Sequence, residues 1–447
     1  MKMNKYNKGI TLVALVVTIV VLIILAGISI NLVLDDNGII SKAQESRRKT
    51  AEGSTNDEKW INELAESIDS MLSENKNPKK DVPVEPTTET APYFPDSTFE
   101  KVGETTLDNG LVIQDSNGNQ FVWVEVPKSL YNDDSYNSNK TKKPSSSVDY
   151  DNIEYCLHQY TMTFRKGSGT AETSYNDTWV EDASNGDWMS SAEYTEKKHK
   201  MLKSIYENGG FYVGRYETGI DTEKEESRYF DISDGTAYTT LHTTTQTPVI
   251  KENEYPYIWV RRTQAQKLAE SFNYNDGTKE YTGSLMFGVQ WDLVLAFMRN
   301  HDVGATDSTI ITDSTTIGNY YNSVFKLNEN GKYTIFSNKV LSSTWIPATT
   351  VTENYVNKGL NKGGFSSYGN GILITTGTSA KNCIANIYDI AGNVEEWTLE
   401  NTVATDKPCA GRGGNYGTSG KFASATYRGK RATNESSYDV GFRIALF

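Results

Sequence analysis

The sequence has few residues of the kinds that most often bind transition metals. It contains three cysteines and four histidines in 447 residues, and Cys156, Cys383 and Cys409 form no CxxC pair. Structural zinc sites are usually built from four such ligands at short spacings, so the pattern argues against a Cys/His zinc site. In an extracellular head, Cys383 and Cys409 are the candidate disulfide pair, and three buried thiols are the alternative.

Positive charge is also scarce. The 57 Asp and Glu outnumber the 44 Lys and Arg, and the formal net charge is −13. Proteins that bind nucleic acid through its phosphates need a basic face, so we expect no nucleic-acid partner. The one basic cluster of note, Lys2, Lys5 and Lys8, lies at the N-terminus.

No charged side chain occurs between Ile10 and Leu34. A helix crosses a bilayer with about 20 apolar residues, so this run is long enough to span it. The lysines precede the run, and Asp35 and Asp36 follow it. The positive-inside rule then places the N-terminus in the cytoplasm and the rest of the chain outside. The sequence predicts a single-pass protein of a bacterial cell membrane, in contact with lipid through residues 10–34.

The junction of the basic leader and the apolar run resembles a type IV prepilin cleavage site, in which the leader ends in glycine. The resemblance implies cleavage between Gly9 and Ile10, after a leader of residues 1–9, and pilin-like subunits as partners. Ala14 stands at the fifth mature position, where pilins usually carry a glutamate that sets subunit register. Whether the protein assembles into a pilus therefore stays open, and an uncleaved signal anchor is the alternative to cleavage.

A stalk and a linker are expected after the apolar run. Residues 35–75 contain an apolar stripe at helical spacing from Trp60 to Leu72, which predicts an amphipathic helix. Residues 76–98 contain five prolines, which predict an extended linker. A globular head over residues 99–447 follows.

The head begins with β patterns. Two apolar runs, 111–114 and 121–124, flank Asn117-Gly118, which predicts a hairpin. A further strand is expected at 211–216, and helices at 263–272 and 291–298. Two polar, turn-rich stretches, 128–205 and 300–380, are expected to be long loops inserted into one domain.

Three motifs near the C-terminus follow one another: NIYDIAGNVEEWT from Asn386, RGGNY from Arg412 and VGFRIAL from Val440. In this order they resemble the formylglycine-generating enzyme (sulfatase-modifying factor) family. Segments 210–217 and 284–292 are similar to upstream parts of that domain. The resemblance implies an α+β, C-type-lectin-like head with long irregular loops and a core over about 205–447.

The motif residues are expected to be structural. Polar side chains would satisfy loop backbone, glycines would allow unusual φ or close packing, aromatic rings would fill the core, and arginines would bind carbonyls or carboxylates. In the family such oxygen-rich loops can also bind Ca²⁺. The residues concerned are Asn386, Asp389, Gly392, Asn393, Glu396, Trp397, Arg412, Gly413, Gly414, Gly441, Phe442 and Arg443.

Catalysis of the family type is not expected. The enzymatic branch uses two cysteines just after the Arg-Gly-Gly strand, and residues 417–428 contain none. Without thiolates the copper chemistry of that branch cannot proceed. A membrane-tethered enzyme of the formylglycine-generating type is the alternative, and a structural or minor pilin subunit is another.

The same segment predicts a binding face, because aromatic and small polar side chains provide adaptable contacts at low entropic cost. The expected partner is an extracellular protein or glycan, bound by a membrane-anchored adhesion protein. The family resemblance adds a receptor-binding protein diversified by a retroelement as an alternative. The candidate ligand-binding residues are Asn415, Tyr416, Lys421, Phe422, Tyr427, Lys430, Arg431, Asn434 and Tyr438.

Overall fold

The computed structural model describes residues 82–166, 175–182, 188–222, 239, 241–324, 326–337, 340–342, 344–348 and 371–447. The expected leader, apolar run and stalk helix lie outside these ranges. Within them, no helix combines the length and the apolar character needed to cross a membrane. The transmembrane helix at 10–34 therefore stays a prediction.

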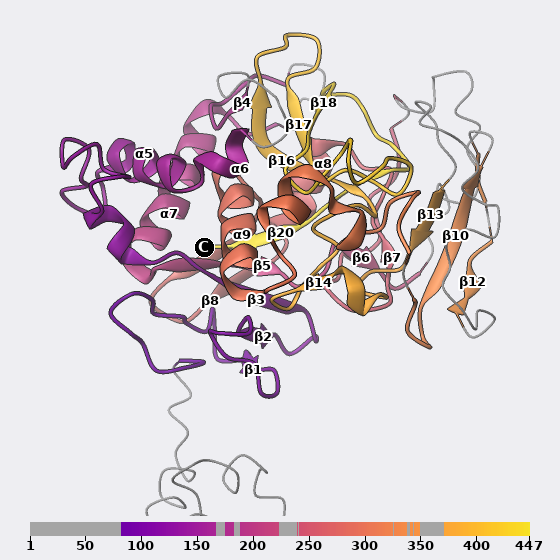
Figure 1. Cartoon of the computed structure of the whole chain (residues 1–447), viewed down its shortest axis with the longest axis horizontal. Coiled ribbons are helices and arrows are strands. Elements are labelled where there is room, and N and C mark those ends of the chain that lie inside the picture. Colours follow the sequence, from indigo (N-terminus) through magenta and orange to yellow (C-terminus); the bar gives the residue numbers. More distant parts are fainter. Residues whose placement is uncertain are drawn as a thin grey trace, which may run out of the picture. The chain divides into compact units, whose positions relative to one another are not determined.

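A seven-stranded antiparallel sheet is organised around the last strand of the chain (Figure 1). β20 (Ile444–Leu446) lies between β5 (Gly210–Gly214) and β9 (Glu280–Leu285). β5 and β20 are buried along their whole length, so the C-terminus closes the centre of the sheet. The outer strands are β3 (Gln120–Glu125), β2 (Val112–Gln114) and β1 (Glu100–Lys101) beyond β5, and β8 (Asn273–Asn275) beyond β9.

The predicted hairpin is confirmed by the pairing of β2 with β3. One oxygen of Asp115 accepts from the backbone N–H groups of Asn117 (2.9 Å) and Asn119 (2.8 Å). Gly118 between them has a φ of +81°, which favours glycine. The strand predicted at 211–216 is present as β5.

A second sheet brings the three C-terminal motifs together. β16 (Glu395–Thr402) pairs antiparallel with β17 (Cys409–Arg412) and parallel with β19 (Val440–Phe442). Glu396 lies opposite both Arg412 and Gly441, so residues far apart in the sequence become neighbours. The other strands of this sheet are β18 (Arg428–Arg431) and β4 (Tyr175–Asn176).

The stretch 300–380, expected to be a loop, contains a small sheet. β10 (Lys332–Ser337) pairs with β13 (Gly371–Ile374) and with two shorter strands. The six-residue strand β10 lies in a stretch rich in Asn, Ser, Thr and Tyr, and this polar composition concealed it. The remaining strands are β11 (Val340–Leu341) and β12 (Ile346–Pro347) on this sheet, and the pairs β6 (Gly219–Ile220) with β7 (Tyr255–Pro256) and β14 (Cys383–Ile384) with β15 (Ile387–Tyr388).

The two predicted helices are present as α8 (Arg262–Ala269) and α9 (Gly288–His301). α9 is buried from Gly288 to Met298, which explains its apolar sequence. Short 3₁₀ turns cover Lys128–Asn132, Ser314–Thr316 and Ala380–Asn382, and a π turn covers Ser308–Thr312.

The stretch 128–205, expected to be an insertion of loops, contains helices among its described residues. It contains α5 (Tyr150–Tyr160), α6 (Met162–Lys166) and most of α7 (Ser191–Asn208), which pack together and against β5 and α9 (Figure 1). A reciprocal capping box of Ser190 and Glu193 starts α7, and Gly209 at a φ of +69° ends it.

The head begins before residue 99. Residues 82–98, expected to be linker, form bends and turns that pack against the sheet. The buried Thr90 hydroxyl accepts from Trp123 Nε1 at 2.8 Å and donates to the Gly209 carbonyl at 3.1 Å. Tyr212 donates to the Tyr93 carbonyl at 2.7 Å. The β-rich sheets with flanking helices are consistent with the expected α+β lectin-like fold.

Candidate functional site

The C-terminal motifs are joined by a buried ion pair. Arg443 follows β19 and places Nη2 2.7 Å from Glu396 Oε1, while its Nε lies 3.1 Å from each carboxylate oxygen. Burial raises the pKa of Glu396, and Arg443 opposes that rise. The remaining Arg443 donors reach the carbonyls of Gly214 on β5 and Tyr388 on β15, so one side chain fastens three elements.

Asn393 connects four segments from a left-handed backbone with φ of +56°. Its Nδ2 donates to Glu217 Oε2 at 2.7 Å, and its Oδ1 accepts from Asn319 Nδ2 at 3.0 Å and from the Ile374 N–H at 3.2 Å. Burial, and then the nearby Asp389 and Glu396, raise the pKa of Glu217 well above its ordinary value. Glu217 was not among the predicted site residues.

The oxygens of the Asn386–Asn393 loop do not fit a Ca²⁺ ion. Asp389 accepts from the Gly377 N–H at 2.8 Å and from Asn382 Nδ2 at 3.0 Å. Asn386 accepts from Arg215 at 3.0 Å and donates to the backbone of 109–110. Ca²⁺ needs six to eight oxygens turned toward one point, whereas these turn toward protein donors.

A second buried network lies beside the first. Arg412 contacts Asp292 at 2.7 Å and Glu400 at 3.0 Å, and Arg428 contacts the other oxygens of the same carboxylates at 2.7 and 3.0 Å. The sequence predicted that Arg412 binds carbonyls or carboxylates, but it did not identify Asp292 and Glu400 as the partners. Asp292 could have been found in the sequence, because it is the one charged residue in the apolar run Trp291–Met298.

The remaining motif residues lie in the interior of the head. Trp397 and Phe442 are buried, and Trp397 Nε1 donates to the Val260 carbonyl at 2.8 Å. Gly413, Gly414 and Gly392 have positive φ. A Cβ on Gly392 would lie 2.2 Å from the Asn319 carbonyl oxygen, and one on Gly441 would lie 2.9 Å from the Val394 side chain.

Three of the nine predicted ligand-binding residues are buried, and a fourth, Arg431, is half-buried and held by ion pairs. Tyr416 and Tyr438 are buried in an apolar cluster with Phe336, so they hold the small sheet against the head. Arg431 binds Glu395 and Glu435, each at 2.6 Å. Asn415 is buried and donates to Asp439 at 2.9 Å. The structure thus corrects a binding face that includes all nine.

The other five lie at least partly at the surface. Lys421, Phe422 and Lys430 are exposed, and Tyr427 and Asn434 are half-buried. The Phe422 side chain is 55% exposed, and its ring lies 5.9 Å from that of Tyr427. We call Lys421, Phe422 and Tyr427 the Phe422 patch.

The three cysteines are free, so the expected Cys383–Cys409 disulfide is not formed. Cys409 is buried on β17, opposite Arg431 on β18, whereas Cys383 is half-buried on β14, opposite Tyr388. Burial raises the pKa of Cys156 and of Cys409 to about 11, and also raises that of Cys383. All three are therefore thiols at neutral pH.

A groove of about 460 Å³ lies between α7 and α8 and contains none of the predicted ligand-binding residues. Its charged lining is balanced, with Lys197, Lys200 and Lys267 against Glu193, Glu196 and Glu270. Lys197 and Glu270 pair across it at 3.1 Å.

Comparisons with known proteins gave one family match and one similar solved structure. Among curated proteins none matches the chain. A solved structure, Treponema denticola variable protein 1, is 12% identical and covers 54% of this chain and 96% of its own, at a TM-score of 0.23. Residues 329–446 match the sulfatase-modifying factor enzyme 1-like domain. This range contains all three C-terminal motifs, and the head of this protein carries a domain of the formylglycine-generating, sulfatase-modifying type.

Proposed function

We propose that the protein is a binding protein of the bacterial cell surface, whose lectin-like head presents the Phe422 patch to an extracellular protein or glycan. The observation that supports this proposal is the Phe422 patch itself. In the segment where the family's enzymes have their cysteine pair, this chain has an exposed phenylalanine beside a tyrosine and a lysine. Large exposed aromatic side chains are typical anchors of binding interfaces.

The networks behind the patch favour a rigid presentation. Arg428 lies one residue after Tyr427 and is held by Asp292 and Glu400. A surface whose backbone is pre-organised loses less conformational entropy when it binds. The absence of cysteine from residues 417–428 speaks against the alternative of a copper-dependent oxidase.

Membrane attachment through residues 10–34 belongs to the same proposal. Deleting these residues should move the protein from the membrane fraction to the soluble or secreted fraction. A protein that stays in the membrane fraction after the deletion would contradict the anchor.

Binding is tested by displaying the full chain on bacteria and measuring cell retention on glycan and matrix-protein arrays. Phe422→Ala should lower retention about tenfold, the effect of losing a hot-spot residue worth more than 1 kcal/mol. Val303→Ala is the matched control, because Val303 is fully exposed elsewhere. Incubation with a cysteine peptide, copper and oxygen tests the alternative, and conversion of the cysteine to formylglycine would overturn the proposal.

A further inference from the structure

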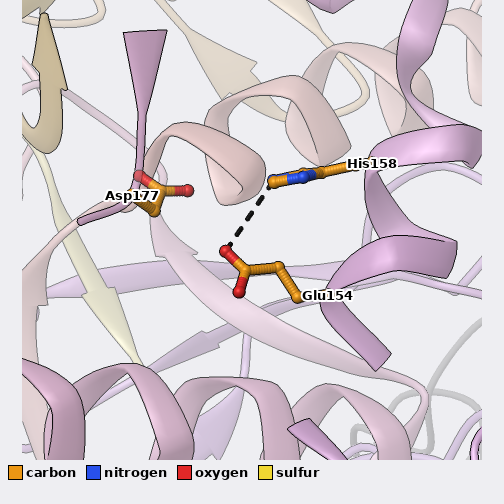
Figure 2. A group of neighbouring side chains, drawn as sticks. All are labelled: Glu154, His158 and Asp177. Atoms are coloured by element: carbon orange, nitrogen blue, oxygen red, sulfur yellow. Dashed lines mark ion pairs between the residues drawn. The ribbon is translucent and has the colours of Figure 1, made fainter. Parts of the chain in front are cut away.

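Glu154, His158 and Asp177 converge on one point of the head, outside the residues that match the family (Figure 2). Glu154 and His158 are four residues apart on α5, so their side chains leave the same face of the helix. Asp177 directly follows β4. One carboxylate oxygen of each acid and a ring nitrogen of His158 lie within 4.8 Å of one another.

The His158 ring nitrogen points into this cluster without a partner. Nε2 is buried and makes no hydrogen bond, and its distance of 4.0 Å from Glu154 Oε1 is too long for one. A buried nitrogen without a partner costs free energy that a bound ligand would recover. An imidazole nitrogen without a hydrogen-bond partner is available as a metal ligand.

The two carboxylates are held in place by other groups. Glu154 Oε2 accepts from Lys198 Nζ at 2.9 Å, which leaves Oε1 facing His158. Asp177 Oδ1 accepts from the backbone N–H of Gly288 (2.7 Å) and Oδ2 from that of Val289 (3.0 Å) at the start of α9. A metal ion would therefore bind the second lone pair of one of these oxygens. Such outer contacts orient metal ligands in known sites. The positive charge of Lys198 repels a metal cation, so we expect a moderate affinity of the site for the metal.

The spacing and chemistry suit a transition metal of zinc type. Two ligands on a tetrahedral ion with bonds of about 2.0–2.1 Å lie about 3.3 Å apart. The ligand atoms lie 4.0 Å apart for His158 Nε2 and Glu154 Oε1, and within 4.8 Å for all three. Binding therefore needs contractions of about 0.7 to 1.5 Å, through side-chain rotation. An imidazole with two carboxylates suits Zn²⁺ better than the all-oxygen shells of Ca²⁺ or Mg²⁺.

We propose that Glu154, His158 and Asp177 bind one divalent transition metal ion of the zinc type, with water completing its coordination. The ion fastens α5 to β4 and, through Asp177, to the start of α9. The site is independent of the Phe422 patch, so either proposal can fail without the other.

The purified full-length protein is treated with a chelator, dialysed and then titrated with Zn²⁺. Calorimetry measures the binding, and the melting temperature is measured with and without Zn²⁺. Zn²⁺ should bind and raise the melting temperature of the wild type. His158→Gln should abolish one equivalent of binding, and Glu154→Gln should weaken that equivalent at least tenfold. His301→Gln is the control, because His301 lies at the end of α9 and contacts the Asp108 carbonyl instead.

Two outcomes would overturn the site: a wild type whose melting temperature does not respond to excess Zn²⁺, or a folded His158→Gln protein that binds Zn²⁺ as the wild type does. If neither variant folds, Co²⁺ loading of the wild type decides the matter. Visible bands of a tetrahedral Co²⁺ site with nitrogen and oxygen ligands are expected, and the spectrum of hydrated Co²⁺ alone would refute the site.

Discussion

The Arg443 guanidinium and the Glu396 carboxylate form a fully buried ion pair, with Nη2 2.7 Å from Oε1. Removing one partner of such a pair leaves an uncompensated buried charge, which typically costs about 3–5 kcal/mol. The pair also connects β16, β19, β5 and β15, so its loss should act on the whole head.

Arg443→Met should therefore lower the free energy of unfolding by about 3–5 kcal/mol, measured by urea denaturation. Lys200→Ala is the control. Lys200 pairs with Glu196 at 3.1 Å, but their side chains are 53% and 68% exposed. Its effect should stay within about 0.5 kcal/mol, and equal effects of the two substitutions would contradict the importance assigned to Arg443.

Gly392→Ala should be much more destabilising than Gly277→Ala. Both glycines have positive φ, +72° and +91°, so alanine is strained at either position. Only at Gly392 would the new Cβ also meet backbone, 2.2 Å from the Asn319 carbonyl oxygen, whereas Gly277 has open space. Denaturation curves should show a loss of about 1–2 kcal/mol at Gly277 and at least about 3 kcal/mol at Gly392. Similar losses would show that the loop moves to accommodate the Cβ.

The contribution of Asp292 to stability should disappear in acid. Burial alone would raise the pKa of this carboxyl, but Arg428 and Arg412 outweigh burial and hold the pKa below 3.8. The folded state then binds the proton more weakly than the unfolded state, so the stabilisation is complete above about pH 4 and is lost as the pH falls through the folded pKa.

Urea unfolding of the wild type and Asp292→Asn at several pH values measures this effect. The asparagine cannot titrate, so the difference in free energy of unfolding should be constant above about pH 5 and shrink below about pH 4. A difference that does not change with pH would mean that Asp292 stabilises the fold without its charge.

The cysteines should react as three free thiols of unequal access. Burial and the raised pKa values of Cys156 and Cys409, about 11 each, predict that both react slowly with a thiol reagent at pH 8. Cys383 is half-buried and should react first. All three should react at once in denaturant, and a Cys383–Cys409 cross-link in peptide maps of the unreduced protein would contradict the structure.

Local patterns predicted the elements whose signals lie within a few residues. The hairpin at Gly118, strand β5 and helices α8 and α9 were all found from alternation, turn chemistry or an apolar run. α7 was missed although its capping pair, Ser190 and Glu193, was visible in the sequence. The small sheet was missed because its strands lie in a polar stretch rich in Asn, Ser and Thr, and because two of them have only two residues.

The sequence shows only part of the candidate metal site. The spacing of Glu154 and His158 is a local pattern and was available in the sequence. Asp177 could not be assigned to them, because only the tertiary structure brings its carboxylate within 4.8 Å of their ligand atoms. A search restricted to cysteines and pairs of histidines passes over such a site.

The sequence by itself determined the kind of domain at the C-terminus, through the order and spacing of its three motifs, and the absence of cysteine from 417–428. It also determined which glycines and arginines those motifs contain. Only the tertiary structure decided which aromatic residues face outward, since Tyr416 and Tyr438 differ from Phe422 in burial and not in chemical type. It also decided the partners of each buried charge, because ion pairs form between strands and helices that no local spacing relates.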